Sequence, residues 1–285
     1  MNPAYLILGL AVALVSVGSI LVRLAQAPSL AVAFYRVALA VVCLAPFAAG
    51  DARRSWPELS ARHRLVLLAS GAALALHFAT WIASLDFTSI ASSVLLVNTA
   101  PLFAVALSRL FLGEGTPPVV LAAIGLALLG AGIIAAGDWA SAPSTLGGNA
   151  LAVAGAATMA VYHVIGRGLR AALPLNAYVL GVWATAALTL LALGTGFGVP
   201  FRGYSPRVLA IFLALAVGPT LGGHGLVNKS LRLLPAPTVG LFLLGEPVAA
   251  SALAYVVFGE VPGVTTVLGG ALVMLALALV LARRA

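Results

Sequence analysis

A carboxylate stands within one of the most apolar stretches of the chain. Glu246 precedes Pro247 in FLLGEPVAASALAYVVFGEVP, the stretch from Phe242 to Pro262. An acid in hydrocarbon is costly unless it is paired or lines a water-filled route. Glu246 could therefore accept the ammonium group of a ligand or exchange a proton. Alternatively, it is a hydrogen-bonded acid beside a helix irregularity, because Pro247 has no backbone N–H to donate.

Histidine and aromatic side chains also lie within apolar stretches, away from the ends of those stretches. His77 and Trp81 are one helical turn apart and share a face, Tyr162 and His163 are adjacent, and Trp183 lies in the next stretch. A ring face attracts an ammonium group, and an indole N–H in hydrocarbon needs a partner. The group predicts an aromatic-walled cavity suited to a zwitterion, although each histidine alone could be an interhelical hydrogen-bonding residue.

Three further polar residues lie in apolar stretches. Asn98 precedes Pro101 and could face the cavity or satisfy backbone groups that the proline frees. Arg36 could bind a carboxylate, but we favour a side chain that snorkels to the membrane surface. His224 lies among glycines, where close helix packing is the simpler explanation. The candidate substrate-binding residues are His77, Trp81, Asn98, Tyr162, His163, Trp183 and Glu246.

The elements that hold these residues are expected to be membrane-spanning helices. Of 285 residues, 62% are hydrophobic and 8% are charged, a balance far from that of a soluble domain. A spanning helix needs about 20 apolar residues. We therefore predict an all-α integral membrane protein with ten helices. The expected spans are residues 4–24, 29–49, 64–85, 88–111, 118–136, 147–169, 175–196, 206–228, 235–258 and 262–282.

The sequence contains an internal repeat. Pro247 aligns with Pro101, 146 residues earlier, whereas Glu246 aligns with Ala100. Each half would hold five helices, so the second half would enter the membrane with opposite polarity. Such inverted repeats place the substrate site where the halves meet. Because the first half has alanine at the equivalent position, the repeat itself does not require an acid there. This difference favours a functional role for Glu246.

The two predicted repeats cover residues 1–140 and 145–285. The matching segments end in Gly113-Glu114 and Gly259-Glu260. Their equivalence suggests a shared structural task, and we expect each glutamate to bond the backbone donors at the start of the next helix.

Basic residues predict the orientation of the helices. The net charge is +8. Eleven basic residues fall on the side of the two termini and three on the other, which places both termini in the cytoplasm. The eleven are Arg53, Arg54, Arg62, Arg64, Arg109, Arg167, Arg170, Lys229, Arg232, Arg283 and Arg284, and the three are Arg23, Arg202 and Arg207. Orientation accounts for the charge, so we predict no nucleic-acid partner.

Three motifs carry a family resemblance: Phe34-Tyr35-Arg36 with Ala40, and the two patterns Pro101…Gly113-Glu114 and Pro247…Gly259-Glu260. In these the chain resembles the drug/metabolite transporter superfamily, specifically the EamA-type ten-helix exporters. It is most similar to bacterial amino-acid exporters, including those for aromatic amino acids. The resemblance implies export of aromatic or other neutral amino acids and similar metabolites across the bacterial cytoplasmic (inner) membrane by alternating access.

Two other classes stay open at this point. A carrier for sugar-phosphates or nucleotide-sugars would need several converging bases, whereas the spans offer Arg36 and, at an end, Lys229. The other class is a channel or a membrane enzyme, but the chain has no HExxH, GxSxG or P-loop motif. We predict no enzyme activity, no catalytic residue, no cofactor and no metal. The expected partners are small-molecule amino acids and membrane lipid, and a monomer is compatible with this function.

Overall fold

A computed structural model describes residues 3–87, 93, 96–139, 146–169, 173–259 and 263–282, and every regular element in those ranges is helical. The expected span 88–111 is thus described from residue 96, and Glu260, Arg170, Arg283 and Arg284 lie outside the described residues. The α-helices are α1 Pro3–Ala25, α2 Ser29–Ser55, α3 Ala61–Phe87, α5 Ala100–Leu107, α6 Pro118–Trp139, α7 Leu146–Leu169, α8 Leu175–Gly196, α9 Pro206–Leu215, α10 Gly225–Ser230, α11 Ala236–Leu243, α12 Glu246–Phe258 and α13 Val264–Ala282. Two π-helices, η1 Ser108–Leu112 and η2 Ala216–His224, complete the set.

Seven described helical stretches are long and apolar enough to cross a membrane. They are Ala4–Ala25, Ser29–Ser55, Ala61–Phe87, Gly147–Leu169, Leu175–Gly196, Pro206–Ser230 and Ala236–Val257. Shorter apolar helical stretches cover Ala100–Leu112, Pro118–Gly130 and Val267–Val280. The predicted all-α, multi-pass character is confirmed, whereas the number of ten spans and their inverted relation stay predictions.

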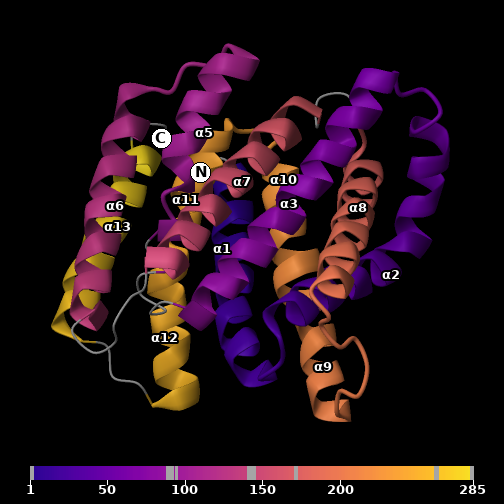
Figure 1. Ribbon diagram of the computed structural model, residues 1–285. Helices are drawn as coiled ribbons and strands as arrows, with labels where there is room; N and C mark the ends of the chain where they lie inside the picture. The colour runs from indigo at the N-terminus through magenta and orange to yellow at the C-terminus, as the bar shows by residue number, and fades with distance from the viewer. Residues whose placement is uncertain are drawn as a thin grey trace.

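The helices pack as a bundle with a helix pair at either edge. α6 runs along α13 at one edge, α2 runs along α8 at the other, and α3 packs on α7 and α8 between them (Figure 1). Small residues allow the close approach. A Cβ at Gly130 of α6 would lie 2.5 Å from Gly269 O of α13. The start of α1 and the end of α13 lie toward the same end of the bundle in Figure 1.

A proline converts one long span into three helical pieces. Pro219 lies inside η2, between α9 and α10, and has no N–H for the carbonyl of Leu215. The hydroxyl of Thr220 donates to that carbonyl, at 2.9 Å. The turn widens to π-helical geometry, which is common at functional sites. The expected span 206–228 is therefore continuous but irregular in its middle.

A second proline interrupts the expected span 235–258. The chain turns at Leu244 and Gly245, where Gly245 N donates to Phe242 O at 3.0 Å, and α12 then begins at Glu246. Pro247 occupies the first turn of α12, where a missing N–H costs little. In the equivalent place of the first half, α5 begins at Ala100 with Pro101 in its first turn.

The two interrupted segments meet. A Cβ at Gly240 of α11 would lie 3.2 Å from Pro101 Cγ of α5, so the glycine allows this proline to pack against α11. Farther along, Gly113 ends η1 and Gly259 ends α12, both in the left-handed region with φ of 66° and 69°. Glycine is the residue that adopts this conformation at little cost.

The expected role of Glu114 is wrong. Its carboxylate accepts from Arg167 Nε at 3.0 Å and pairs with Nη2 at 2.9 Å, and so it does not cap the helix that follows. Arg167 Nη1 also donates to the carbonyls of Leu231 and Arg232, at 3.2 and 3.0 Å. Arg167 thus joins the end of α7 to the segment after η1 and to the end of α10. We refer to these contacts as the Arg167 tie.

Candidate substrate cavity

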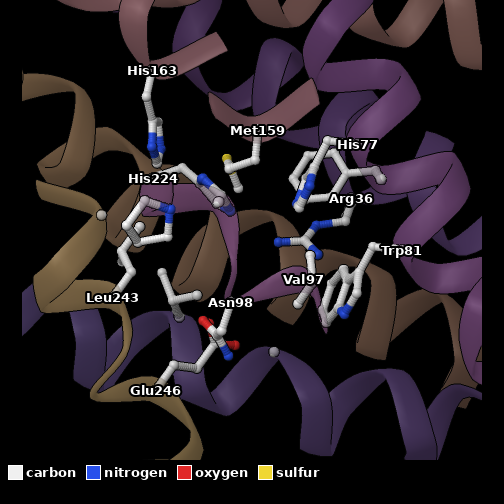
Figure 2. Close-up of a pocket in the computed structure, with 16 residues that line it drawn as sticks. Arg36, His77, Trp81, Val97, Asn98, Met159, His163, His224, Leu243 and Glu246 are labelled. Carbon is white, nitrogen blue, oxygen red and sulfur yellow. The ribbon is translucent and has the colours of Figure 1, made fainter. Parts of the chain in front are cut away.

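A small cavity lies at the meeting point of α1, α2, α3, α5, α7, η2, α11 and α12 (Figure 2). Its volume is about 60 Å³. Pockets that enclose a drug-sized ligand usually exceed about 300 Å³, so this space holds a few water molecules as it stands. Five candidate residues line it, namely His77, Trp81, Asn98, His163 and Glu246.

Tyr162 and Trp183 do not line this cavity. Tyr162 is fully buried and accepts a hydrogen bond from Asn228 Nδ2 at 2.5 Å, which links α7 to α10. The Asn228 amide also donates to His224 O at 2.8 Å. Trp183 is 1% exposed and packs in the main hydrophobic core. Their helices turn both side chains away from the cavity.

Arg36 lies in this cavity and not at the membrane surface. The expected snorkelling is wrong, because the residue is 2% exposed and its side chain points inward from α2. Its Nε donates to Thr220 Oγ1 at 3.2 Å, and its guanidinium carbon lies 4.2 Å from the centre of the Phe78 ring. A cation over an aromatic face is favourable. These contacts fix the guanidinium and leave its two terminal nitrogens directed at the cavity, without a hydrogen bond to the described residues.

Glu246 enters the cavity from another side (Figure 2). It is the first residue of α12, where the helix dipole favours a negative charge. Its backbone carbonyl lies 3.4 Å from the hydroxyl of Ser16, which also donates to Val12 O at 2.7 Å. The Glu246 carboxylate itself makes no hydrogen bond with the described residues. The break between α11 and α12 thus places the acid at a helix start in the interior.

Arg36 and Glu246 attract each other electrostatically but are not in contact. Each acts on the other through space, and among the described residues no ion pair joins them. Two opposite charges therefore face one cavity from α2 and α12. Separated charges in an apolar interior are costly unless a third group or water compensates each of them.

Imidazole and indole groups complete the wall. The His77 ring stacks on Trp81 with centroids 5.9 Å apart and planes inclined by 9°. Its Nδ1 lies 3.0 Å from Gly155 O and must donate, because a carbonyl only accepts. The His224 ring meets Phe78 edge-on at 5.4 Å.

Several nitrogens in this wall lack partners. Trp81 Nε1, His163 Nε2 and His224 Nδ1 are buried and make no hydrogen bond within the described part of the chain. Unsatisfied buried polar groups are rare in folded proteins and usually mark the place of water or a ligand. His224 was expected to be a packing residue, so the cavity adds His224, Arg36, Phe78 and Met159 to the residues proposed from the sequence.

A second hollow adjoins the cavity at Trp81. It has a volume of about 420 Å³, and its wall includes Arg23, Gln26 and Asp86. Ser29 donates a hydrogen bond to the Asp86 carboxylate at its rim, which links α2 to α3. Trp81 lines both spaces, so its side chain stands between the small cavity and the larger polar hollow.

Comparisons with known proteins agree with this architecture. The sequence profile of the EamA-like transporter family matches residues 2–136 and again residues 146–282. A protein of Streptantibioticus cattleyicolor named as a probable terminal-alkyne amino-acid exporter is 31% identical over 183 residues, which is 62% of this chain and 59% of that protein.

A solved crystal structure of a protein of unstated function has a TM-score of 0.77 and 24% identity, and the match covers 100% of this chain and 99% of that one. At this identity the likeness concerns the fold alone. The family profile, which covers most of the sequence in two matches, together with helices able to cross a membrane, points to a transporter rather than an enzyme. The chain therefore belongs to the EamA-like transporter family and has the helices of a multi-pass membrane protein.

Proposed function

We propose that this transporter exports amino acids, including aromatic and other neutral ones, and similar metabolites across the bacterial cytoplasmic membrane. The observation that carries the proposal is the cavity, in which a guanidinium, a carboxylate and a stacked His77–Trp81 pair face one space. A zwitterion with an apolar side chain matches this combination of charge and aromatic surface. The Streptantibioticus relative is named as a probable exporter of terminal-alkyne amino acids, which supports an amino-acid substrate.

The proposed mechanism is alternating access between two inverted repeats of five helices, residues 1–140 and 145–285, with both termini in the cytoplasm. Elements from both parts line the cavity, since α1, α2, α3 and α5 belong to the first and α7, η2, α11 and α12 to the second. Helices interrupted near the middle of a membrane are typical of substrate sites in such carriers. The helix starts of α5 and α12, both next to a proline, support this mechanism, and we assign them to the middle of the membrane.

The other substrate classes fit the cavity less well. A sugar-phosphate or nucleotide-sugar carries at least two negative charges and calls for several cations. Arg36 is the one Lys or Arg among the described lining residues, and Glu246 repels an anion. A channel or an enzyme stays an alternative that flux measurements can exclude. The described residues that line the cavity belong to one chain, which is compatible with a monomer.

The test is counterflow in proteoliposomes that contain the purified protein. Vesicles loaded with unlabelled amino acid should accumulate the labelled one transiently, which a channel cannot do. A panel of neutral, aromatic, acidic and basic amino acids, with a hexose phosphate as the anionic probe, would define the substrate class. Flux with the hexose phosphate and none with any amino acid would overturn the proposal. Protein-free vesicles give the background.

Glu246 permits either ammonium binding or proton exchange, and the same vesicles separate the two. If the carboxyl group carries protons across, a pH gradient should stimulate wild-type transport and not the Glu246→Gln variant. A stimulation that persists in Glu246→Gln would exclude proton exchange at this residue and leave ammonium binding or a structural role. Glu58→Gln is the matched control, because Glu58 is exposed outside the cavity.

A further inference from the structure

We infer that Arg36 and Glu246 form a divided ion pair that binds the two charges of an α-amino acid, with Arg36 on the carboxylate and Glu246 on the ammonium group. The inference rests on the proposed function and specifies it. The substrate must then carry both charges in the free form. Amines without a carboxylate and acids without an ammonium group would be rejected.

The Arg36 guanidinium, which would donate hydrogen bonds to the substrate carboxylate, is already fixed in position. Arg36 uses Nε for Thr220 and the face of its guanidinium for Phe78. The two terminal nitrogens keep the planar, parallel geometry that binds both oxygens of a carboxylate. Because Thr220 and Phe78 already fix the side chain, little rotational freedom remains to be lost on binding.

The Glu246 carboxylate, which would accept from the substrate ammonium group, makes no hydrogen bond with the described residues. Glu246 is the first residue of α12 and lies among Asn98, Leu243 and Pro101 in the cavity wall. No side chain in the described part of the chain neutralises it by direct contact, and Arg36 acts on it only across the cavity. An ammonium group placed there would find an opposite charge in an environment with little water, where such pairs are strong.

The size of the space limits what can bridge the two charges. At about 60 Å³ the space between the two charges favours a short, doubly charged unit over an extended ligand. Neutral side chains, among them Trp81 and Met159, also line the cavity and are available to contact the substrate side chain. Arg36 and Glu246 therefore bind the charged groups that all α-amino acids share. The neutral residues of the cavity wall accept different side chains.

The separation of the charges is also a device for specificity. If the guanidinium and carboxylate touched, they would neutralise each other and bind a zwitterion weakly. Held apart, each stays uncompensated until a ligand supplies both opposite charges. A ligand that supplies one charge leaves the other protein group unpaired in the interior, which is the basis of discrimination by buried polar groups.

Competition in the counterflow assay tests this inference. Labelled L-phenylalanine is the probe. The competitors are L-phenylalanine, phenethylamine, which lacks the carboxylate, and 3-phenylpropanoate, which lacks the ammonium group. In the wild type, both analogues should compete about tenfold or more weakly than phenylalanine, because each loses one charge-assisted contact.

The variants assign each charge to its partner. Arg36→Gln should weaken competition by phenylalanine about tenfold or more, so that phenethylamine competes as well as phenylalanine does. Arg36→Lys should recover part of the affinity for phenylalanine. In Glu246→Gln, 3-phenylpropanoate should compete as well as phenylalanine does. Glu246→Asp should recover part of the affinity for phenylalanine. A merely structural role would weaken all three competitors alike. Arg207→Gln and Glu58→Gln, at exposed positions, should leave the ratios unchanged.

Two results would count against the inference in different ways. Counterflow of phenylalanine with equal competition by both analogues would overturn the divided ion pair and leave amino-acid export intact. No counterflow of any amino acid in the wild type would overturn the proposed export, and the divided ion pair with it. Since the wild-type competition requires no variant, the inference can be tested even if a substituted protein fails to fold.

Discussion

The Arg36 guanidinium is fixed by Thr220, whose Oγ1 accepts from Arg36 Nε at 3.2 Å and donates to Leu215 O at 2.9 Å. One hydroxyl thus bonds the carbonyl of Leu215, to which Pro219 cannot donate, and orients the buried cation. This relationship connects the irregular geometry of η2 to the cavity. It also makes Thr220 a positioning residue, since its side chain acts on a ligand through Arg36.

Replacing this hydroxyl should weaken amino-acid binding. Thr220→Val removes the hydroxyl that accepts from Arg36 Nε and leaves this buried donor without a partner, at a cost of about 1–3 kcal/mol. We expect lower thermal stability and a higher half-saturation concentration for phenylalanine. Thr220→Ser, which keeps the hydroxyl, is the matched control and should stay close to the wild type in both measurements. Equal effects of the two variants would contradict the role of the hydroxyl.

The stacked pair His77 and Trp81 should contribute aromatic surface to binding. Trp81→Ala removes the ring that lines both the cavity and the second hollow, so we expect weaker phenylalanine binding by about 1–2 kcal/mol. Trp81→Phe keeps an aromatic face and should retain most of the affinity. Isothermal titration with purified protein measures the difference. An unchanged affinity in Trp81→Ala would place the substrate side chain elsewhere.

The Arg167 tie should stabilise the folded protein. Arg167→Gln breaks the contacts to Glu114 and to the carbonyls of Leu231 and Arg232, and we expect a loss of about 1–3 kcal/mol. The control is Arg54→Gln, because Arg54 is 79% exposed in its pair with Asp51 and such pairs contribute about 0–1 kcal/mol. Thermal unfolding in one detergent compares them. Equal midpoints would mean that the Arg167 tie contributes no more than a surface pair.

Close packing of α3 on α8 should make Gly71 intolerant of a larger side chain. A Cβ there would lie 2.5 Å from Thr185 Cβ and 2.6 Å from Val182 O. We expect Gly71→Ala to lower stability by about 1–3 kcal/mol, the usual cost of overpacking. Gly9→Ala meets no atom within 4 Å and should be neutral or slightly stabilising, since alanine favours the helix. Similar unfolding midpoints for both variants would contradict the packing described here.

Hydropathy predicts the membrane helices well because the bilayer sets their length. The expected span 29–49 appears as α2, Ser29–Ser55, and the expected span 175–196 as α8, Leu175–Gly196. The effect of Pro247 was also predictable, since a missing N–H must interrupt the hydrogen bonding of a helix. What the sequence predicted less well is where a helix is irregular but continuous, as in η2.

The direction of each side chain was harder to predict. Sequence places Tyr162 and His163 at one depth, yet the rotation of α7 about its own axis decides that His163 lines the cavity and Tyr162 does not. Arg36 points inward because Thr220 and Phe78, far away in the sequence, receive it. Glu114 likewise found its partner in Arg167, 53 residues later. Such long-range pairings depend on helix packing, which one sequence does not reveal.

The ribosome adds the two charged residues that face the cavity at widely separated times. Arg36 lies in the second helix of the chain, and Glu246 follows more than two hundred residues later. A ligand held by both would fasten the first-made part of the protein to the last-made part. By linkage, a ligand that binds only the fully assembled protein stabilises it by mass action. A nascent chain without α12 would therefore contain one of the two charged groups and would gain no such stabilisation from the ligand.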